Sequence, residues 1–219
     1  MSVLFREKMD VEKYLKSCRE VFWRNIFQLE LDYLVSRLKG SRDVLSIGCG
    51  PAIIEGELGK QGFHVTGLDI SLEALKCAPD NVRTVVGRAE VMPFSDASFD
   101  AVIYVASVQF VEDYRRAVQR SAAVLRPRGM IVVMLLNPGS EFFKERFVDP
   151  TSYISMIRHD DLAQIENVIA EYFAFRRREY IIGVKGDETF ASKDPGEAAL
   201  YVIVGEKTPA AKRFMNAKS

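Results

Sequence analysis

The chain has 219 residues, 48% of them hydrophobic, which is enough to bury one substantial core, and a single domain over 1–219 is expected. Thirty Lys and Arg balance 30 Asp and Glu, so no overall positive field favours nucleic acid or an anionic membrane as a partner. Cys18, Cys49 and Cys77 lack CxxC spacing, and neither a metal site nor a disulfide framework is predicted. No apolar run approaches the roughly 20 residues of a membrane span, and the first residues lack a signal-peptide core. We therefore expect a soluble, cytoplasmic protein.

Apolar residues at helical spacing predict helical structure over residues 10–39, which Gly40 ends. Strands and helices then alternate. Strands are predicted at 44–47, 63–68, 82–86, 101–105 and 130–136, and helices at 55–61, 72–77 and 114–124. This alternation predicts an α/β fold with a doubly wound, mostly parallel sheet and helices on both faces. Right-handed crossovers would place the ligand crevice along the edge where the parallel strands end.

The alternation changes after the last of these strands. Residues 137–172 are expected to form an insertion that includes a helix at 160–172. Two strands are then predicted at 173–184 and 199–205, joined by a connection that contains Gly, Asp and Pro. Such a connection suits an antiparallel hairpin with a long loop.

A glycine-rich turn and a downstream acid suggest a nucleotide site. Gly48 and Gly50 follow the first strand, where glycine permits positive φ and close approach of a ligand to the backbone. Asp69 ends the next strand and could accept hydrogen bonds from two ribose hydroxyls. The alternative for the glycines is that they serve only the packing of the turn. The alternative for Asp69 is that it caps the following helix, although Ser71 is the better cap candidate. Nicotinamide dinucleotides use the same layout with a third Gly or Ala, but Ile53 stands there and its bulk disfavours a diphosphate.

Two later segments extend the pattern: residues 87–100, GRAEVMPFSDASFD, and residues 125–129, LRPRG. With the turn and Asp69, they resemble the GDAexLPFxdxsFD and LkPGG segments of the small-molecule class I methyltransferases, a group that includes quinone-biosynthesis enzymes and uses S-adenosylmethionine (SAM). The resemblance extends from about residue 44 to residue 136. It implies the seven-stranded sheet of that class and SAM as the cofactor.

The resemblance also implies which residues touch the cofactor. They lie at the carboxyl ends of the predicted strands. The glycine turn would lie beneath the methionine part of SAM, and the acid would bind the ribose. Further residues would surround the adenine, and the end of the fourth strand would lie near the methyl group. The implied cofactor-binding residues are Gly48, Cys49, Gly50, Asp69, Ile70, Arg88, Ala89 and Val105. No metal is implied. No catalytic residue is assigned, because methyl transfer relies on positioning and needs a base only for a protonated acceptor.

Three residues depart from the family pattern. Ser46 stands where an acid usually orients the methionine ammonium, so an attractive charge is missing. Arg88 stands where an aspartate commonly accepts from the adenine amino group, and Arg has donors only, so this contact would pass to a backbone carbonyl or to Glu90. Ala52 replaces the third glycine of the turn, a mild change if its φ is negative.

The acceptor is expected beneath a cover formed by residues 1–40 and 137–172. For the aromatic candidates the alternative is ordinary core packing, and for the histidine it is an exposed position at a helix start. The candidate acceptor-binding residues are Tyr14, Trp23, Ser107, Phe143 and His159.

Three hypotheses about function follow. The leading one is a SAM-dependent methyltransferase acting on an unidentified small molecule. The second is a SAM-binding sensor or sequestering protein without methyl transfer, motivated by Ser46, Arg88 and the lack of an obvious base. The third is a nicotinamide-dependent oxidoreductase, which Ile53 disfavours.

Overall fold

The computed structural model describes residues 11–209, with side chains from residue 15 onward. Its centre is an eight-stranded sheet in the order β3-β2-β1-β4-β5-β8-β6-β7. The strands are β1 (Asp43–Ile47), β2 (His64–Asp69), β3 (Arg83–Val86), β4 (Phe99–Val105), β5 (Leu125–Leu136), β6 (Phe173–Lys185), β7 (Glu188–Phe190) and β8 (Ala198–Lys207). The first five are parallel, and β8 pairs antiparallel with both β5 and β6. The prediction of a doubly wound, mostly parallel sheet with an antiparallel C-terminal hairpin is confirmed.

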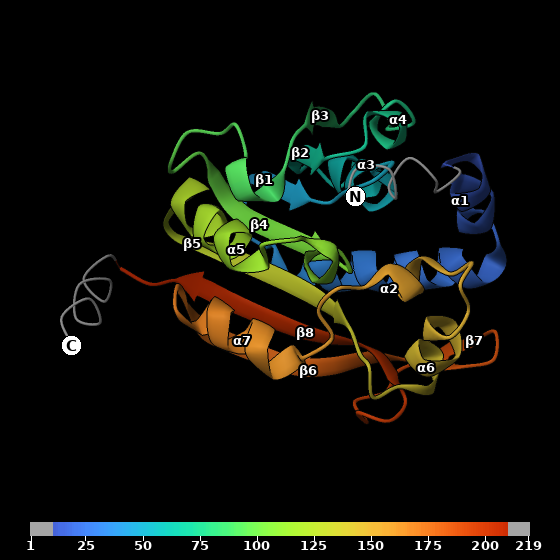
Figure 1. Ribbon diagram of the computed structural model, residues 1–219. Coiled ribbons are helices and arrows are strands. Elements are labelled where there is room, and N and C mark those ends of the chain that lie inside the picture. Colours follow the sequence, from blue (N-terminus) through green and yellow to red (C-terminus); the bar gives the residue numbers. More distant parts are fainter. Residues whose placement is uncertain (1–10, 210–219) are drawn as a thin grey trace.

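Helices cover both faces of the sheet (Figure 1). They are α1 (Val11–Cys18), α2 (Val21–Arg37), α3 (Ile53–Lys60), α4 (Leu72–Leu75), α5 (Tyr114–Val124), α6 (Glu141–Phe147) and α7 (Leu162–Ala170), with short 3-10 helices η1 (Ala89–Val91), η2 (Val108–Phe110) and η3 (Tyr153–Met156). One buried cluster joins the sheet to α2, α3, α6 and η3, and a second joins the opposite face to α5 and α7. Alternate strand residues enter opposite clusters: Leu45 and Ile47 pack with α5 and α7, whereas Val44 packs with α2 and α3.

The eighth strand is an addition to the seven expected. β7 forms in the connection between β6 and β8 and pairs antiparallel with the end of β6. Gly183 makes the pairing possible, because a Cβ there would lie 2.4 Å from the ring of Phe190. The short strand therefore depends on a contact within the loop.

The N-terminal helical region is divided. α1 ends at Cys18 and α2 begins at Val21, because Glu20 between them has an extended backbone, with φ −65° and ψ 148°. The expected helix over 10–39 is therefore two helices. No helix in residues 11–209 has the length and apolar character to cross a membrane.

The parallel strands end on the side of the molecule where α1, α6 and η3 lie (Figure 1). The loops after β1, β2, β3 and β4 converge at that edge. The predicted cofactor residues belong to these loops and strand ends, so the fold brings them together as expected for a crevice at the carboxyl ends of strands.

Candidate functional site

The turn after β1 takes the backbone form that its glycines permit. Gly48 and Gly50 have φ values of +72° and +54°. A Cβ on Gly48 would lie 2.7 Å from the Cβ of Ser107, whereas a Cβ on Gly50 would meet no atom within 4 Å. Gly48 therefore holds the turn against the loop after β4, and Gly50 leaves open space over the turn. A ligand can approach the backbone there, as the predicted cofactor site requires.

Asp69 fixes the shape of this turn from the neighbouring strand. Its Oδ2 accepts a hydrogen bond from the Gly50 backbone N at 2.8 Å, and its Oδ1 accepts one from the Ser71 N at 2.8 Å. Each carboxylate oxygen has capacity for another donor, so both remain able to accept from vicinal hydroxyls. Ser71 caps α4 by accepting from the Ala74 N at 3.2 Å. The expectation that Ser71, and not Asp69, is the N-cap is confirmed.

A carboxyl group from another element lies beside Ser46. The Ser46 hydroxyl donates to Oε1 of Glu55, on α3, at 2.5 Å, and both residues are buried. Burial raises the pKa of Glu55 to about 7 against the effect of the Ser46 hydrogen bond, and Asp69 adds repulsion. A carboxyl group therefore lies beside the turn although β1 carries none. Sequence reasoning missed Glu55, because its position relative to β1 depends on how α3 packs.

Ala52 differs from the mild substitution expected. It has a φ of +55° and precedes α3 in the left-handed conformation. A residue with a Cβ there costs about 1 kcal/mol relative to glycine. The third position of the turn therefore keeps the backbone geometry of a glycine while carrying alanine.

The expected adenine side combines apolar surface with a network of charges. Ile70 is 37% exposed at the end of β2, and Ala89 is buried at the start of η1. Arg88 Nη2 donates to Glu90 Oε1 at 3.0 Å and to Glu112 Oε2 at 3.1 Å. Its guanidinium thus joins η1 to the segment before α5, and the carboxylates of Glu90 and Glu112 stand beside it as acceptors.

Residues after β4 bind the turn to the rest of the sheet. Val105 is partly buried at the end of β4, and Ser107 donates its hydroxyl to the Ile47 carbonyl at 2.6 Å. Fully buried Gln109 accepts from the Leu136 N at 2.6 Å and donates to the Leu136 O at 3.1 Å. Sequence reasoning missed Gln109, whose amide acts as a clamp between η2 and the end of β5.

Cys49 is a packing residue within the turn. Its Sγ occupies the space over Gly67, where a Cβ would lie 2.6 Å from the sulfur. Burial, followed by the charges of Glu55 and Asp69, raises the pKa of the Cys49 thiol. The thiol therefore stays protonated and is a poor nucleophile.

Comparison with known proteins agrees with this geometry. A family model described as a methyltransferase domain matches residues 45–133. The demethylmenaquinone methyltransferase of Corynebacterium glutamicum strain R is 33% identical over 112 residues, 51% of this chain and 46% of the relative. Residues 45–133 of this chain therefore match a methyltransferase domain, and the chain has the fold of a SAM-dependent methyltransferase. It spans about half the length of the curated relatives that it matches.

Solved structures show the same fold over most of the chain. A SAM-dependent methyltransferase of Thermotoga maritima, titled a possible histamine N-methyltransferase, has a TM-score of 0.76 at 22% identity and covers 91% of this chain and 96% of its own. The [4+2]-cyclase SpnF has a TM-score of 0.61 at 19% identity over 74% of this chain and 63% of its own. At these identities the likeness concerns the fold, and chemistry must be argued from the site.

The region expected to form the cover is aromatic. The ring of Trp23 packs against three other aromatic rings. The distances between ring centroids are 5.1 Å to Phe22, 6.2 Å to Phe142 and 6.3 Å to Tyr153. Phe143 is 4% exposed and belongs to the core cluster beside α2. The structure thus places Phe143 in the core, and contact with an acceptor stays a prediction for both Trp23 and Phe143. Tyr14 lies in α1, with its side chain outside the described part.

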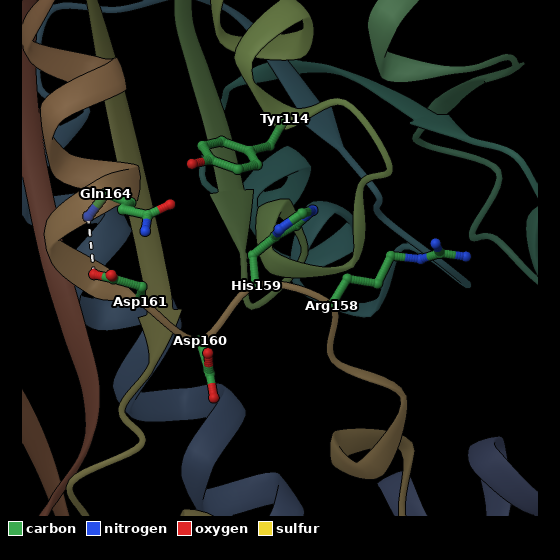
Figure 2. Close-up of a pocket in the computed structure, with 6 residues that line it drawn as sticks. All are labelled: Tyr114, Arg158, His159, Asp160, Asp161 and Gln164. Atoms are coloured by element: carbon green, nitrogen blue, oxygen red, sulfur yellow. Dashed lines mark hydrogen bonds between the residues drawn. The ribbon is translucent and has the colours of Figure 1, made fainter.

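His159 lines a pocket of about 180 Å³ between α5 and the start of α7. Figure 2 shows its ring beside that of Tyr114, at a centroid distance of 4.7 Å. The ring Nε2 lies 2.9 Å from the Val111 carbonyl, and the backbone N of His159 donates to the Gln109 carbonyl. Nε2 is therefore the protonated nitrogen, and His159 anchors the segment before α7 to the loop after β4. A role in acceptor binding stays a prediction.

Proposed function

We propose that this domain transfers the methyl group of SAM to a small-molecule acceptor. The observation that carries the proposal is the turn at Gly48 and Gly50, held open by Asp69, inside a segment that matches the methyltransferase-domain family. When bound, SAM supplies an electrophilic methyl: the acceptor's lone pair forms the new bond to carbon, and the C–S electrons return to sulfur.

The residues of the chain bind and orient the two reactants. Gly50 exposes its backbone surface to the methionine part, and Asp69 offers both carboxylate oxygens to the ribose. Glu55, positioned by Ser46, places a carboxyl where the family carries its acid. Ile70 and Ala89 provide apolar contacts for the adenine. Val105 ends β4 and Ser107 follows it beside the turn, where the acceptor is proposed to bind, which fits catalysis by alignment without a dedicated base.

The acceptor is proposed to be small because the matched relatives with known reactions, such as the demethylmenaquinone methyltransferase, are named for small-molecule substrates. The aromatic cover formed by Trp23, Phe142 and Tyr153 suits an acceptor with apolar surface. The fold neighbour titled a possible histamine N-methyltransferase leaves nitrogen as well as oxygen and carbon acceptors within the proposal.

The direct test incubates the protein with methyl-labelled SAM and a fractionated metabolite extract. We expect a labelled product and an equal amount of S-adenosylhomocysteine, both absent with Asp69→Ala. Asp80→Ala, an exposed acid outside the site, serves as the matched control and should transfer like the wild type. SAM binding without label transfer in any fraction would contradict methyl transfer and favour a SAM-binding sensor.

A further inference from the structure

A buried carboxyl on α2 has no role in the site described so far. Glu30 is 4% exposed, and its Oε2 has no hydrogen-bond partner among the residues the structure describes. Leaving a buried polar atom unpaired costs on the order of 1–3 kcal/mol, and more for a charged one. A ligand that carries a hydrogen-bond donor could supply the missing partner.

The surroundings of Glu30 identify its place in the fold. Glu55, on α3, is the charged neighbour that acts on its carboxyl, and Tyr153, in η3, interacts with Glu30 from the cover. Glu55 in turn lies near Cys49 and Asp69 of the cofactor site. Glu30 therefore lies between the cofactor turn and the cover, where both reactants of a methyl transfer meet.

The charges that act on Glu30 itself are acidic, whereas the cation of the neighbouring aromatic cluster, Arg146, acts on Tyr153 and lies over the rings of Trp23 and Phe142. Burial, then repulsion from Glu55, raises the pKa of Glu30 to about 8, and the pKa of Glu55 is raised to about 7. From the cover, Tyr153 adds a phenol whose own pKa is raised mainly by burial. Neither carboxyl has a cationic partner among the described residues. Two buried acids that repel each other and have no cationic partner form a site suited to a positive ligand.

Aromatic rings complete this site. Tyr153 packs against Trp23 at a centroid distance of 6.3 Å and against Phe110 at 6.0 Å. Trp23 lies seven residues before Glu30 on α2, which places the two on the same side of the helix. The Arg146 guanidinium already lies over the Trp23 ring, 5.9 Å from its centroid, so the rings of Tyr153 and Phe110 are the ones that can add to the attraction of the carboxyl group for a cation.

We propose that Glu30 binds a protonated amino group carried by a reactant of the domain. This inference rests on the proposed function, since it assumes that SAM and an acceptor meet at this edge. An ammonium group supplies both the donor that Glu30 Oε2 lacks and the charge that opposes Glu55. Two reactants can bring this group: the acceptor, as a primary amine, and SAM, through its methionine ammonium. The contact with Tyr153 of the cover favours the acceptor.

The first test compares Glu30→Gln with the wild type by calorimetric titration at pH 7. The ligands are SAM and 5′-methylthioadenosine, which keeps the adenosine and sulfur but lacks the ammonium group. If Glu30 holds the SAM ammonium, the substitution weakens SAM binding at least about tenfold and leaves 5′-methylthioadenosine binding unchanged. Asp32→Asn, an exposed acid of the same helix that accepts from Gln28, is the matched control and should change neither.

The second test titrates amines into protein that is saturated with S-adenosylhomocysteine. The amines are phenethylamine, tryptamine and putrescine, and phenethyl alcohol is the neutral analogue of phenethylamine. If Glu30 holds the acceptor amine, at least one amine binds the wild type about tenfold more tightly than Glu30→Gln, and phenethyl alcohol does not discriminate between them. Repeating either titration in buffers of different ionisation enthalpy should show less proton release in the variant than in the wild type, because an arriving cation ionises Glu30 in the wild type, whereas only Glu55 can still release a proton in Glu30→Gln.

The outcomes distinguish a failure of the ammonium site at Glu30 from a failure of the proposed SAM site. Wild type that binds neither SAM nor 5′-methylthioadenosine would refute the SAM site itself. Wild type that binds both, with Glu30→Gln folded and unchanged in both titrations and in proton release, would overturn the ammonium site alone. A shift confined to SAM, or confined to an amine of the panel, supports the site and names the reactant.

Discussion

At the scale of single residues, Gly48 combines two constraints that no other residue type meets. Its φ is +72°, and a Cβ would collide with Ser107 at 2.7 Å. Gly48→Ala should lower the free energy of unfolding by about 2–4 kcal/mol, from backbone strain and steric overlap together, and should abolish SAM binding. Denaturant unfolding and calorimetry measure the two effects.

Gly62→Ala is the control for this prediction. Gly62 also has positive φ, +93°, but a Cβ there meets no atom within 4 Å. In Gly62→Ala the free energy of unfolding should fall only by the cost of a left-handed backbone with a Cβ, about 1–2 kcal/mol, and SAM binding should equal that of the wild type. Equal SAM affinity in both variants would show that the turn at Gly48 is not part of the cofactor site.

Glu30 also makes stability depend on pH. Its pKa is about 8 in the folded protein against 4.5 as the ordinary value, so between these pH values the folded state binds more protons than the unfolded state. Stability therefore falls as pH rises through this window and levels off above it. Glu30→Gln should remove part of this slope and be more stable than the wild type at pH 8.5, on the order of 1–3 kcal/mol.

Denaturant unfolding from pH 5 to pH 9 checks this prediction, with Asp32→Asn as the control that retains the slope. A slope unchanged by Glu30→Gln would show that this carboxyl is ionised at neutral pH. If Glu30→Gln makes the protein more stable, the carboxyl of Glu30 does not serve folding, which fits a role in binding.

Single residues differ in how far the sequence reveals them. Gly48, Gly50 and Asp69 were predictable because turn geometry and strand order fix their places locally. Glu30 and Glu55 were not, because an acid in an amphipathic helix is normally solvated, and only the packing of α2 against α3 shows that these two are buried.

At the scale of elements, Gln109 holds three segments together. Its side chain bonds both backbone groups of Leu136, and its carbonyl accepts from the backbone N–H groups of Arg158 and His159. Gln109→Ala should cost about 2–4 kcal/mol, because it leaves a buried N–H and a buried C=O unpaired. Denaturant unfolding tests it, and Gln164→Ala, at an exposed position of α7, should change stability by less than about 0.5 kcal/mol.

A loss below about 1 kcal/mol for Gln109→Ala would mean that water or another side chain replaces the amide. The sequence alone does not reveal this clamp. A polar residue in the loop after β4 is ordinarily exposed, and the partner Leu136 is distant in the chain.

Elements with a periodic pattern were predicted well, and those defined by tertiary contacts were not. The alternation of strands and helices from β1 to β5 follows directly from apolar periodicity. The break between α1 and α2 results from the extended backbone of Glu20. The sequence has no Gly or Pro at this point that would have predicted the break. β7 rests on the contact between Gly183 and Phe190.

At the scale of the whole molecule, the strand order explains why distant segments form one site. The turn after β1, Asp69 at the end of β2 and the loop after β4 come together because the three strands are parallel neighbours. This much of the site follows from the alternating pattern and handedness rules. The cover was predictable only as a region, since the positions of α2, α6 and η3 depend on the packing of their aromatic side chains.

The central claim is that the crevice at the carboxyl ends of these strands binds SAM. The most direct measurement is a calorimetric titration of the protein with SAM, S-adenosylhomocysteine and NAD. We expect one site per chain for SAM and S-adenosylhomocysteine, no binding of NAD because Ile53 stands where dinucleotide-binding turns carry a small residue, and no binding of any of the three by Asp69→Ala. Binding of NAD by the wild type without binding of SAM would contradict the account.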